Sequence, residues 1–200
     1  MVGFLGITFL LSRATRAHFL DRHERWPYLV AFIGIFLTSI GSSYYHWSPD
    51  NARLVWDRLP MTIVFMSIVA AIIAERINLR AGLWLLPVLL MVGVLSVLQW
   101  YASELRGAGD LRFYAAVQVY AALVLLVTLL IPSRYTHGSD LAIVVGFYIL
   151  AKAFEQCDKQ IFSAGQWISG HTLKHLAGAA AGFWILRMLQ KRRPIADSSQ

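Results

Sequence analysis

The chain has 200 residues, of which 58% are hydrophobic and 14% are charged, and its mean hydropathy is +0.57. These values lie outside the range of soluble domains and predict one integral membrane domain over residues 1–200 rather than two soluble ones. The net charge of +7 would fit nucleic-acid binding, but most basic residues lie in short segments between apolar runs, so we expect no nucleic-acid partner.

Seven apolar segments follow one another along the chain, and their long aliphatic runs indicate helices rather than barrel strands. Residues 1–11 are too few to cross a hydrocarbon core of about 30 Å, which needs about 20 helical residues, so we expect a partial helix there. Six longer segments each fit a full span: 26–46, 54–74, 82–102, 111–132, 139–162 and 168–190. The predicted fold is therefore all-α, a polytopic transmembrane helix bundle with six full spans plus a partial N-terminal one, which is a seven-helix plan.

The segments between these spans define two sides of the expected membrane. Side A has residues 12–25, 75–81, 133–138 and the C-terminus, and side B is the opposite side. Of the 18 basic residues, eleven lie toward side A and seven toward side B, namely Arg53, Arg58, Arg106, Arg112, Lys152, Lys159 and Lys174. This excess predicts that side A, with the C-terminus, is cytoplasmic. His18, His23 and His137 lie in side-A segments and are expected to be solvated.

Polar residues interrupt the predicted spans in three places, all toward side B. Ionisable groups inside or at the edge of a membrane are costly, which makes them functional candidates. Ser42 and His46 are four residues apart and share a helical face. His171 and His175 have the same spacing, which a helix can use to hold a metal ion, although each pattern alone also fits structural histidines. The small residues of "AGAAAG", which follow in the last segment, predict close packing that would bring these histidines near the second segment.

Asp57 is the third interruption. Ser48 followed by Pro49 is typical of an N-cap and a first helical position, so we expect the third helix to begin there, with Asp57 about two turns in. An ion pair with Arg58 is the structural interpretation of Asp57, although adjacent helical residues do not face each other. Pro60 is expected to bend this helix and to free a backbone carbonyl.

Together, His46, His171 and His175 offer three neutral nitrogen ligands, the number that a catalytic zinc ion with an open fourth position uses. Asp57 would then accept a proton from a water molecule at that position. Ser42 would donate a hydrogen bond to a developing oxyanion.

A further polar cluster lies in "LAKAFEQCDKQIF", where Lys152, Glu155, Asp158 and Lys159 follow at three- and four-residue steps. Mutual ion pairing at a helix end is one interpretation. The other is that Lys152, Glu155 and Asp158 support the metal site from behind by orienting a zinc-bound histidine. Cys157 is the single cysteine, so an intrachain disulfide is excluded, and we expect it to be a small buried apolar residue.

The stretches "GSSYYHWSPDNARLVWDRLPMT", "LAKAFEQCDKQIF" and "SGHTLKHLAGAAAG" together resemble the alkaline ceramidase family. They are also similar to the wider superfamily of seven-helix membrane hydrolases, with its adiponectin-receptor-like and haemolysin-III-like proteins. The resemblance covers roughly residues 26–190. It implies a zinc-dependent intramembrane amidase that hydrolyses ceramide-like lipids to a fatty acid and a sphingoid or similar amino-lipid.

In that family three histidines bind Zn²⁺, an aspartate contacts the zinc-bound water and a serine assists the oxyanion. These roles fall on His46, His171, His175, Asp57 and Ser42. The family also has an acidic N-terminal segment that binds Ca²⁺. The present sequence begins "MVGFLG" and has no such segment, so a Ca²⁺ cofactor is not implied. The implied partner is a membrane lipid substrate, and no protein partner is evident.

Two other classes of function remain open at this point. The chain could be a non-enzymatic seven-helix receptor or membrane-stress protein in which zinc has a structural role. Asp57 separates this class from an enzyme, because a structural zinc ion needs no nearby base. A transporter would need polar residues along a whole path across the membrane, and the clustering toward side B disfavours it. The predicted site faces the extracytoplasmic side.

Overall fold

The structure is a computed structural model that describes residues 1–195, apart from the side chains of Ala14, Arg16, Ala17 and Ala164. Within these residues the chain forms α-helices and no strand, which confirms the all-α prediction. In chain order the helices are α1 Val2–Leu11, α2 Arg25–Trp47, α3 Asn51–Arg76, α4 Leu79–Glu104, α5 Arg112–Thr128, α6 Asp140–Gln156, α7 Asp158–Gly165 and α8 Gly170–Lys191. Two short 3-10 helices, η1 Arg13–His18 and η2 Arg22–Glu24, connect α1 to α2.

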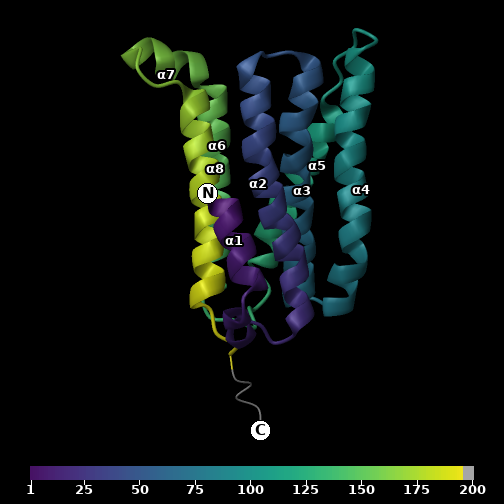
Figure 1. Ribbon diagram of the computed structural model, residues 1–200, viewed down its shortest axis with the longest axis vertical. Helices are drawn as coiled ribbons and strands as arrows, with labels where there is room; N and C mark the ends of the chain where they lie inside the picture. Colours follow the sequence, from purple (N-terminus) through teal and green to yellow (C-terminus); the bar gives the residue numbers. More distant parts are fainter. Residues whose placement is uncertain (196–200) are drawn as a thin grey trace.

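The long helices run side by side along the long axis of the molecule (Figure 1). α2 packs against α3, α3 against α4, and α6 against α8, while the short α1 packs against α2 and α8. The main core lies where α1, α2, α3 and α8 meet, and its fully buried side chains include Leu10, Phe32, Ile72 and Leu189. α7 projects from the end of the bundle that corresponds to side B (Figure 1).

Three helical segments are long and apolar enough to cross a membrane: Arg22–Trp47, Asn51–Arg76 and Leu79–Glu104. The last of these exposes a row of apolar side chains on its outer surface, namely Val88, Met91, Leu95 and Leu98. A soluble monomer rarely exposes a continuous apolar surface of this kind. These features agree with an integral membrane protein.

The segment 139–162 was predicted as one helix, and this prediction is wrong. α6 ends at Gln156, Cys157 leaves the helical conformation with φ −94° and ψ 17°, and α7 begins at Asp158. Cys157 is exposed at this break, so its predicted burial is also wrong. The acidic and basic residues at three- and four-residue steps continue across the break, and this spacing suggested a continuous helix.

The turn between α2 and α3 also differs from the prediction. Ser48 is the residue that ends α2, and α3 begins at Asn51 with Asp50 as its N-cap. The Asp50 carboxylate accepts a hydrogen bond of 2.7 Å from the Arg53 backbone amide, which satisfies a free donor of the first turn. The Arg53 guanidinium donates 2.6 Å to the Ser48 carbonyl and closes the turn.

Gly41 sets the close approach of α2 to α3. A Cβ atom at this position would collide with the backbone carbonyl of Trp56. That carbonyl is the one that Pro60 leaves without its usual amide partner, because proline has no N–H four residues later. The two helices therefore touch backbone to backbone directly beside Ser42 and Asp57.

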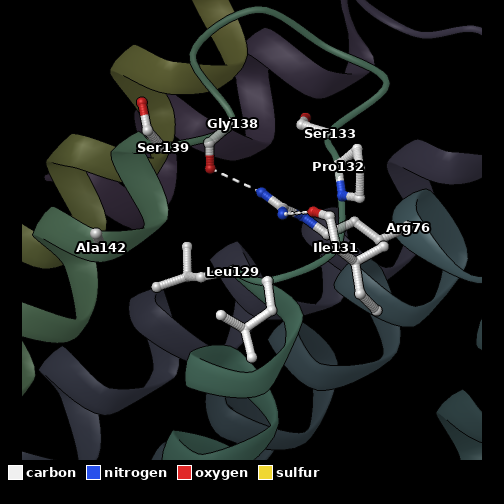
Figure 2. A pocket seen from close by; sticks show the side chains of 9 residues that line it. Arg76, Leu129, Ile131, Pro132, Ser133, Gly138, Ser139 and Ala142 are labelled. Atoms are coloured by element: carbon white, nitrogen blue, oxygen red, sulfur yellow. Dashed lines mark hydrogen bonds between the residues drawn. The ribbon is translucent and has the colours of Figure 1, made fainter.

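The side-A end of the bundle is closed by polar contacts that the sequence does not reveal. Arg76 donates to the carbonyls of Ile131 (2.6 Å) and Gly138 (2.8 Å), as Figure 2 shows, and to that of Thr128 (2.7 Å). α3 therefore holds the loop between α5 and α6. His18 is buried, so its predicted solvation is wrong, whereas His23 and His137 are exposed as predicted.

His18 is buried because the chain folds back after α8. Its Nδ1 donates 2.9 Å to the Arg192 carbonyl. The buried Arg192 guanidinium pairs with Glu75 and stacks on Phe19 and Tyr135. This cluster anchors the end of α8 to the side-A end of α3.

Candidate metal centre

Three histidines from two helices converge at the side-B end of the bundle. The Nε2 atoms of His46 and His175 each lie 2.9 Å from the Nε2 atom of His171. All three possible ligand atoms lie within 4.8 Å of one another. Three imidazole nitrogens this close together offer a donor set that a metal site uses.

The positions of the histidines follow from helix ends. His46 lies in the last turn of α2, and His171 and His175 lie in the first two turns of α8. Ser169 caps α8 through a 3.2 Å hydrogen bond from the Thr172 amide. A Cβ atom at Gly170 would collide with the carbonyl of Phe154, so this glycine lets α8 start directly against α6.

Asp158, one of the predicted supporting residues, fixes the start of α8. Its Oδ1 accepts a hydrogen bond of 2.7 Å from the backbone amide of His171. It thus holds the backbone of a candidate metal ligand. A carboxylate near the N-terminus of a helix is favourable, because the free amides and the helix dipole attract negative charge there.

Lys152 and Glu155, the other two predicted supporting residues, belong to an ion-pair network between α6 and α8. Glu155 accepts 2.8 Å from Lys152 and 3.0 Å from Lys174. Lys174 immediately precedes His175, so the network fixes the rotation of α8 at the level of the histidines. No short spacing in the sequence connects Lys174 with Glu155, since the two are 19 residues apart.

Asp57 and Ser42 are both buried, each only 9% exposed, on the two helices that meet at the side-B turn. Asp57 lies near enough to act electrostatically on the rings of His171 and His175, but it is not a member of the three-histidine group. Its Oδ1 atom is buried and has no hydrogen-bond partner among residues 1–195. A buried carboxylate oxygen without a partner is costly, and such an atom needs an explanation.

Arg58 does not pair with Asp57 in the described part of the chain, where Asp57 Oδ1 and Arg58 Nη1 both lack a hydrogen-bond partner. Its guanidinium lies 4.0 Å from the ring centre of Trp100 and 5.1 Å from that of Tyr114. The ion-pair interpretation of Asp57 is therefore wrong, and Arg58 faces α4 and α5 instead. No spacing in the sequence connects positions 58, 100 and 114, so sequence reasoning had no signal for this contact.

Two surface hollows of the molecule are lined by residues other than the three histidines. One hollow of about 410 Å³ is lined by Arg76, Pro132, Gly138 and neighbouring residues at side A (Figure 2). A second of about 410 Å³ lies along α2 and α3 between Leu37 and Trp56. Neither contains a histidine. His46 and His175 are exposed and His171 is half-buried, so the candidate centre is open to molecules at the side-B end.

The chain has no significant match among protein-family models, curated proteins or solved structures.

Proposed function

We propose that the protein is a zinc-dependent membrane hydrolase that cleaves the amide bond of ceramide-like lipids. One observation carries the proposal: the buried Oδ1 of Asp57 has no hydrogen-bond partner among residues 1–195, and this carboxylate acts electrostatically on two of the three clustered imidazoles. A base that must take a proton from water needs such a free oxygen.

The donor set fits a zinc ion. Tetrahedral zinc with Zn–N distances of about 2.0–2.1 Å needs nitrogen atoms about 3.3 Å apart. Two Nε2 separations are 2.9 Å and all three ligand atoms lie within 4.8 Å of one another, so the two short separations would open by a few tenths of an ångström around the ion. His46, His171 and His175 would hold it. When bound, zinc supplies a Lewis acid and lowers the pKa of a coordinated water.

In the proposed reaction, Asp57 transfers the proton and Ser42 stabilises the oxyanion. Asp57 accepts a proton from the water that attacks the amide carbonyl carbon. Ser42, one turn before His46 on α2, donates a hydrogen bond to the carbonyl oxygen as it becomes negative. The C–N bond breaks as Asp57 gives its proton to the leaving nitrogen. The products are a fatty acid and an amine, and Asp57 is restored.

The substrate class follows from the resemblance to alkaline ceramidases and from the apolar surroundings. A purely structural zinc site, as in a receptor or membrane-stress protein, needs no general base, so it does not explain the free carboxylate oxygen of Asp57. It would leave the cost of the unpaired buried oxygen without compensation. We therefore favour the enzyme.

The proposal includes the seven-helix plan, with α1, α2, α3, α4, α5, α6 and α8 as the membrane helices and α1 as the partial one. Exposed tryptophans support two interface levels. Trp26 and Trp84 lie toward side A, and Trp47, Trp56 and Trp167 lie toward side B. Trp26 and Trp47 are 21 residues apart in α2, or about 31 Å along a helix, close to the thickness of a hydrocarbon core. Tryptophan is enriched at both membrane surfaces.

The excess of basic residues at side A predicts a cytoplasmic C-terminus, so the histidines would face the extracytoplasmic surface. The lipid would enter from the side, with its amide at the headgroup level and its tails between the helices.

The test is a lipid analysis of purified protein incubated with a mixture of amide lipids. The wild-type protein should release fatty acid and amine from one class of lipid, and the Asp57→Asn variant should release about 10²–10⁴-fold less. Equal release by the two proteins would remove Asp57 from the reaction. No release by either from any amide or ester lipid would refute the hydrolase.

A further inference from the structure

α7, residues 158–165, is the one helix of the described chain that leaves the bundle. It follows the break at Cys157 and projects sideways at the side-B end, away from α2 to α5 (Figure 1). It packs against α8 and α6. Most of its surface therefore has no neighbour within the bundle.

The exposed surface of α7 has two chemically different sides. Ile161 and Phe162 lie on one side of the helix, and Phe162 is 51% exposed. Lys159, Gln160 and Ser163 lie on the other side, because successive helical residues are about 100° apart. An amphipathic helix that projects from a protein is stable where its apolar side contacts an apolar medium and its polar side contacts water, as at a membrane surface.

The turn after α7 extends the apolar edge. Gln166 adopts a left-handed conformation with φ 56°, and the chain then reverses toward α8. Trp167 is 93% exposed and Ile168 is 51% exposed. Phe162, Trp167 and Ile168 thus form an apolar edge, which we name the α7 edge.

Two observations identify the medium that covers the α7 edge. Trp47 at the end of α2 is 90% exposed and Trp56 near the start of α3 is 59% exposed, at the same end of the bundle. The two helices on which α7 packs, α6 and α8, also expose apolar side chains farther from this end of the bundle, including Ile149 and Leu176. The α7 edge therefore lies at the end of helices whose exposed apolar side chains would face lipid tails.

We propose that α7 is an interfacial helix whose edge lies in the headgroup region of the bilayer beside the histidines. Asp158, its first residue, accepts the amide hydrogen of His171. The depth of α7 in the interface therefore sets the depth of His171, and it places the candidate centre where a lipid amide lies. This inference rests on the proposed membrane embedding and does not depend on the proposed hydrolysis.

The experiment measures the depth of single fluorescent labels in proteoliposomes. An environment-sensitive label is attached to cysteines that replace Phe162, Trp167, Gln160 or Leu95, each in a Cys157→Ser background. Leu95, exposed in the middle of α4, reports the embedding of the bundle, and Gln160 reports the polar side of α7. Lipids brominated near the headgroup or deep in the acyl chain quench from the membrane, and iodide quenches from water.

Labels at 162 and 167 should be quenched by the shallow brominated lipid, the label at 95 by the deep one, and the label at 160 by iodide. Iodide quenching at 162 and 167, with 95 still deep, would overturn the interfacial helix and leave the embedding intact. Protection of 162 and 167 from both quenchers would also overturn it, because protein, such as a second copy, would then cover the edge. Iodide quenching at 95 would instead refute the membrane embedding itself.

Discussion

Ser42 lies on the buried side of α2, one helical turn before His46. Its neighbour Ser43 is exposed and donates 2.8 Å to the Ser39 carbonyl within the same helix. The two residues carry the same hydroxyl group, but Ser42 is buried and Ser43 is exposed. They therefore form a matched pair of positions for testing the oxyanion role of Ser42.

We predict that Ser42→Ala keeps its zinc and loses less than about 10³-fold in turnover, the cost of one oxyanion donor. Ser43→Ala should keep both zinc and turnover. The measurement is kcat on a ceramide-like substrate together with metal content. A Ser42→Ala enzyme with wild-type kcat would remove this serine from the mechanism.

At this scale the sequence predicted that His46, His171 and His175 lie together, because a four-residue spacing places His171 and His175 on one helical face. It did not predict the surroundings of single polar groups. His18 is buried against the carbonyl of a residue 174 positions away, and Arg58 stacks on two rings from other helices. Such contacts depend on the packing of distant segments, for which a single sequence has no periodic signal.

The contact between α2 and α3 determines how Ser42 and Asp57 approach each other. Gly41 lies against the Trp56 carbonyl, so even one methyl group there must move the helices apart. Gly146 in α6 has open space around its Cβ position and serves as the control.

We predict that Gly41→Ala destabilises the protein by about 1–3 kcal/mol through overpacking and also lowers turnover, since it separates the two helices that hold the site. Gly146→Ala should be stabilising by about 0.5–1 kcal/mol, because alanine favours a helix over glycine. Thermal unfolding in detergent and kcat check both. Gly41→Ala with unchanged stability would show that the helices can separate without cost.

The start of α8 depends on Asp158, which holds the His171 backbone from another helix. We predict that Asp158→Ala weakens zinc binding about 10- to 100-fold, the usual effect of losing a group that supports a metal ligand. Lys159→Ala, next to it on the exposed side of α7, should bind zinc as the wild type does. Competition with a chelator measures the affinity, and equal affinities for the two variants would contradict the supporting role.

The apolar runs predicted where helices occur. Inside a membrane, a helix can satisfy all backbone hydrogen-bonding groups of such a long apolar segment. Helix ends were less predictable. α7 was hidden within a predicted span since its charged residues continue the spacing of α6. Ser48 resembled an N-cap, whereas Asp50 two residues later makes the capping hydrogen bond.

At the scale of the whole molecule, the polar contacts divide between two ends. The side-B end holds the open three-histidine group, and the side-A end holds the closed cluster of Arg192, Glu75 and His18. The side-B group is thus open to its surroundings, whereas the side-A cluster is buried. This division makes the orientation in the membrane a functional question.

We predict that side B is extracytoplasmic. In a Cys157→Ser background, a membrane-impermeant thiol reagent added to intact cells should label a cysteine at Ala108, which is exposed in the loop between α4 and α5. It should not label one at Arg80, which is exposed at the opposite end, unless the cells are permeabilised. The reverse pattern would place the histidines at the cytoplasmic surface.

Zinc content and amide hydrolysis, measured on the same purified preparations, test the central claim most directly. The wild type should hold one zinc ion per chain and release amine. The His171→Ala, His175→Ala double variant should lose both, Asp57→Asn should keep zinc and lose about 10²–10⁴-fold in turnover, and the exposed His23→Ala control should keep both. Full zinc occupancy in the double variant, or wild-type turnover by Asp57→Asn, would contradict the account.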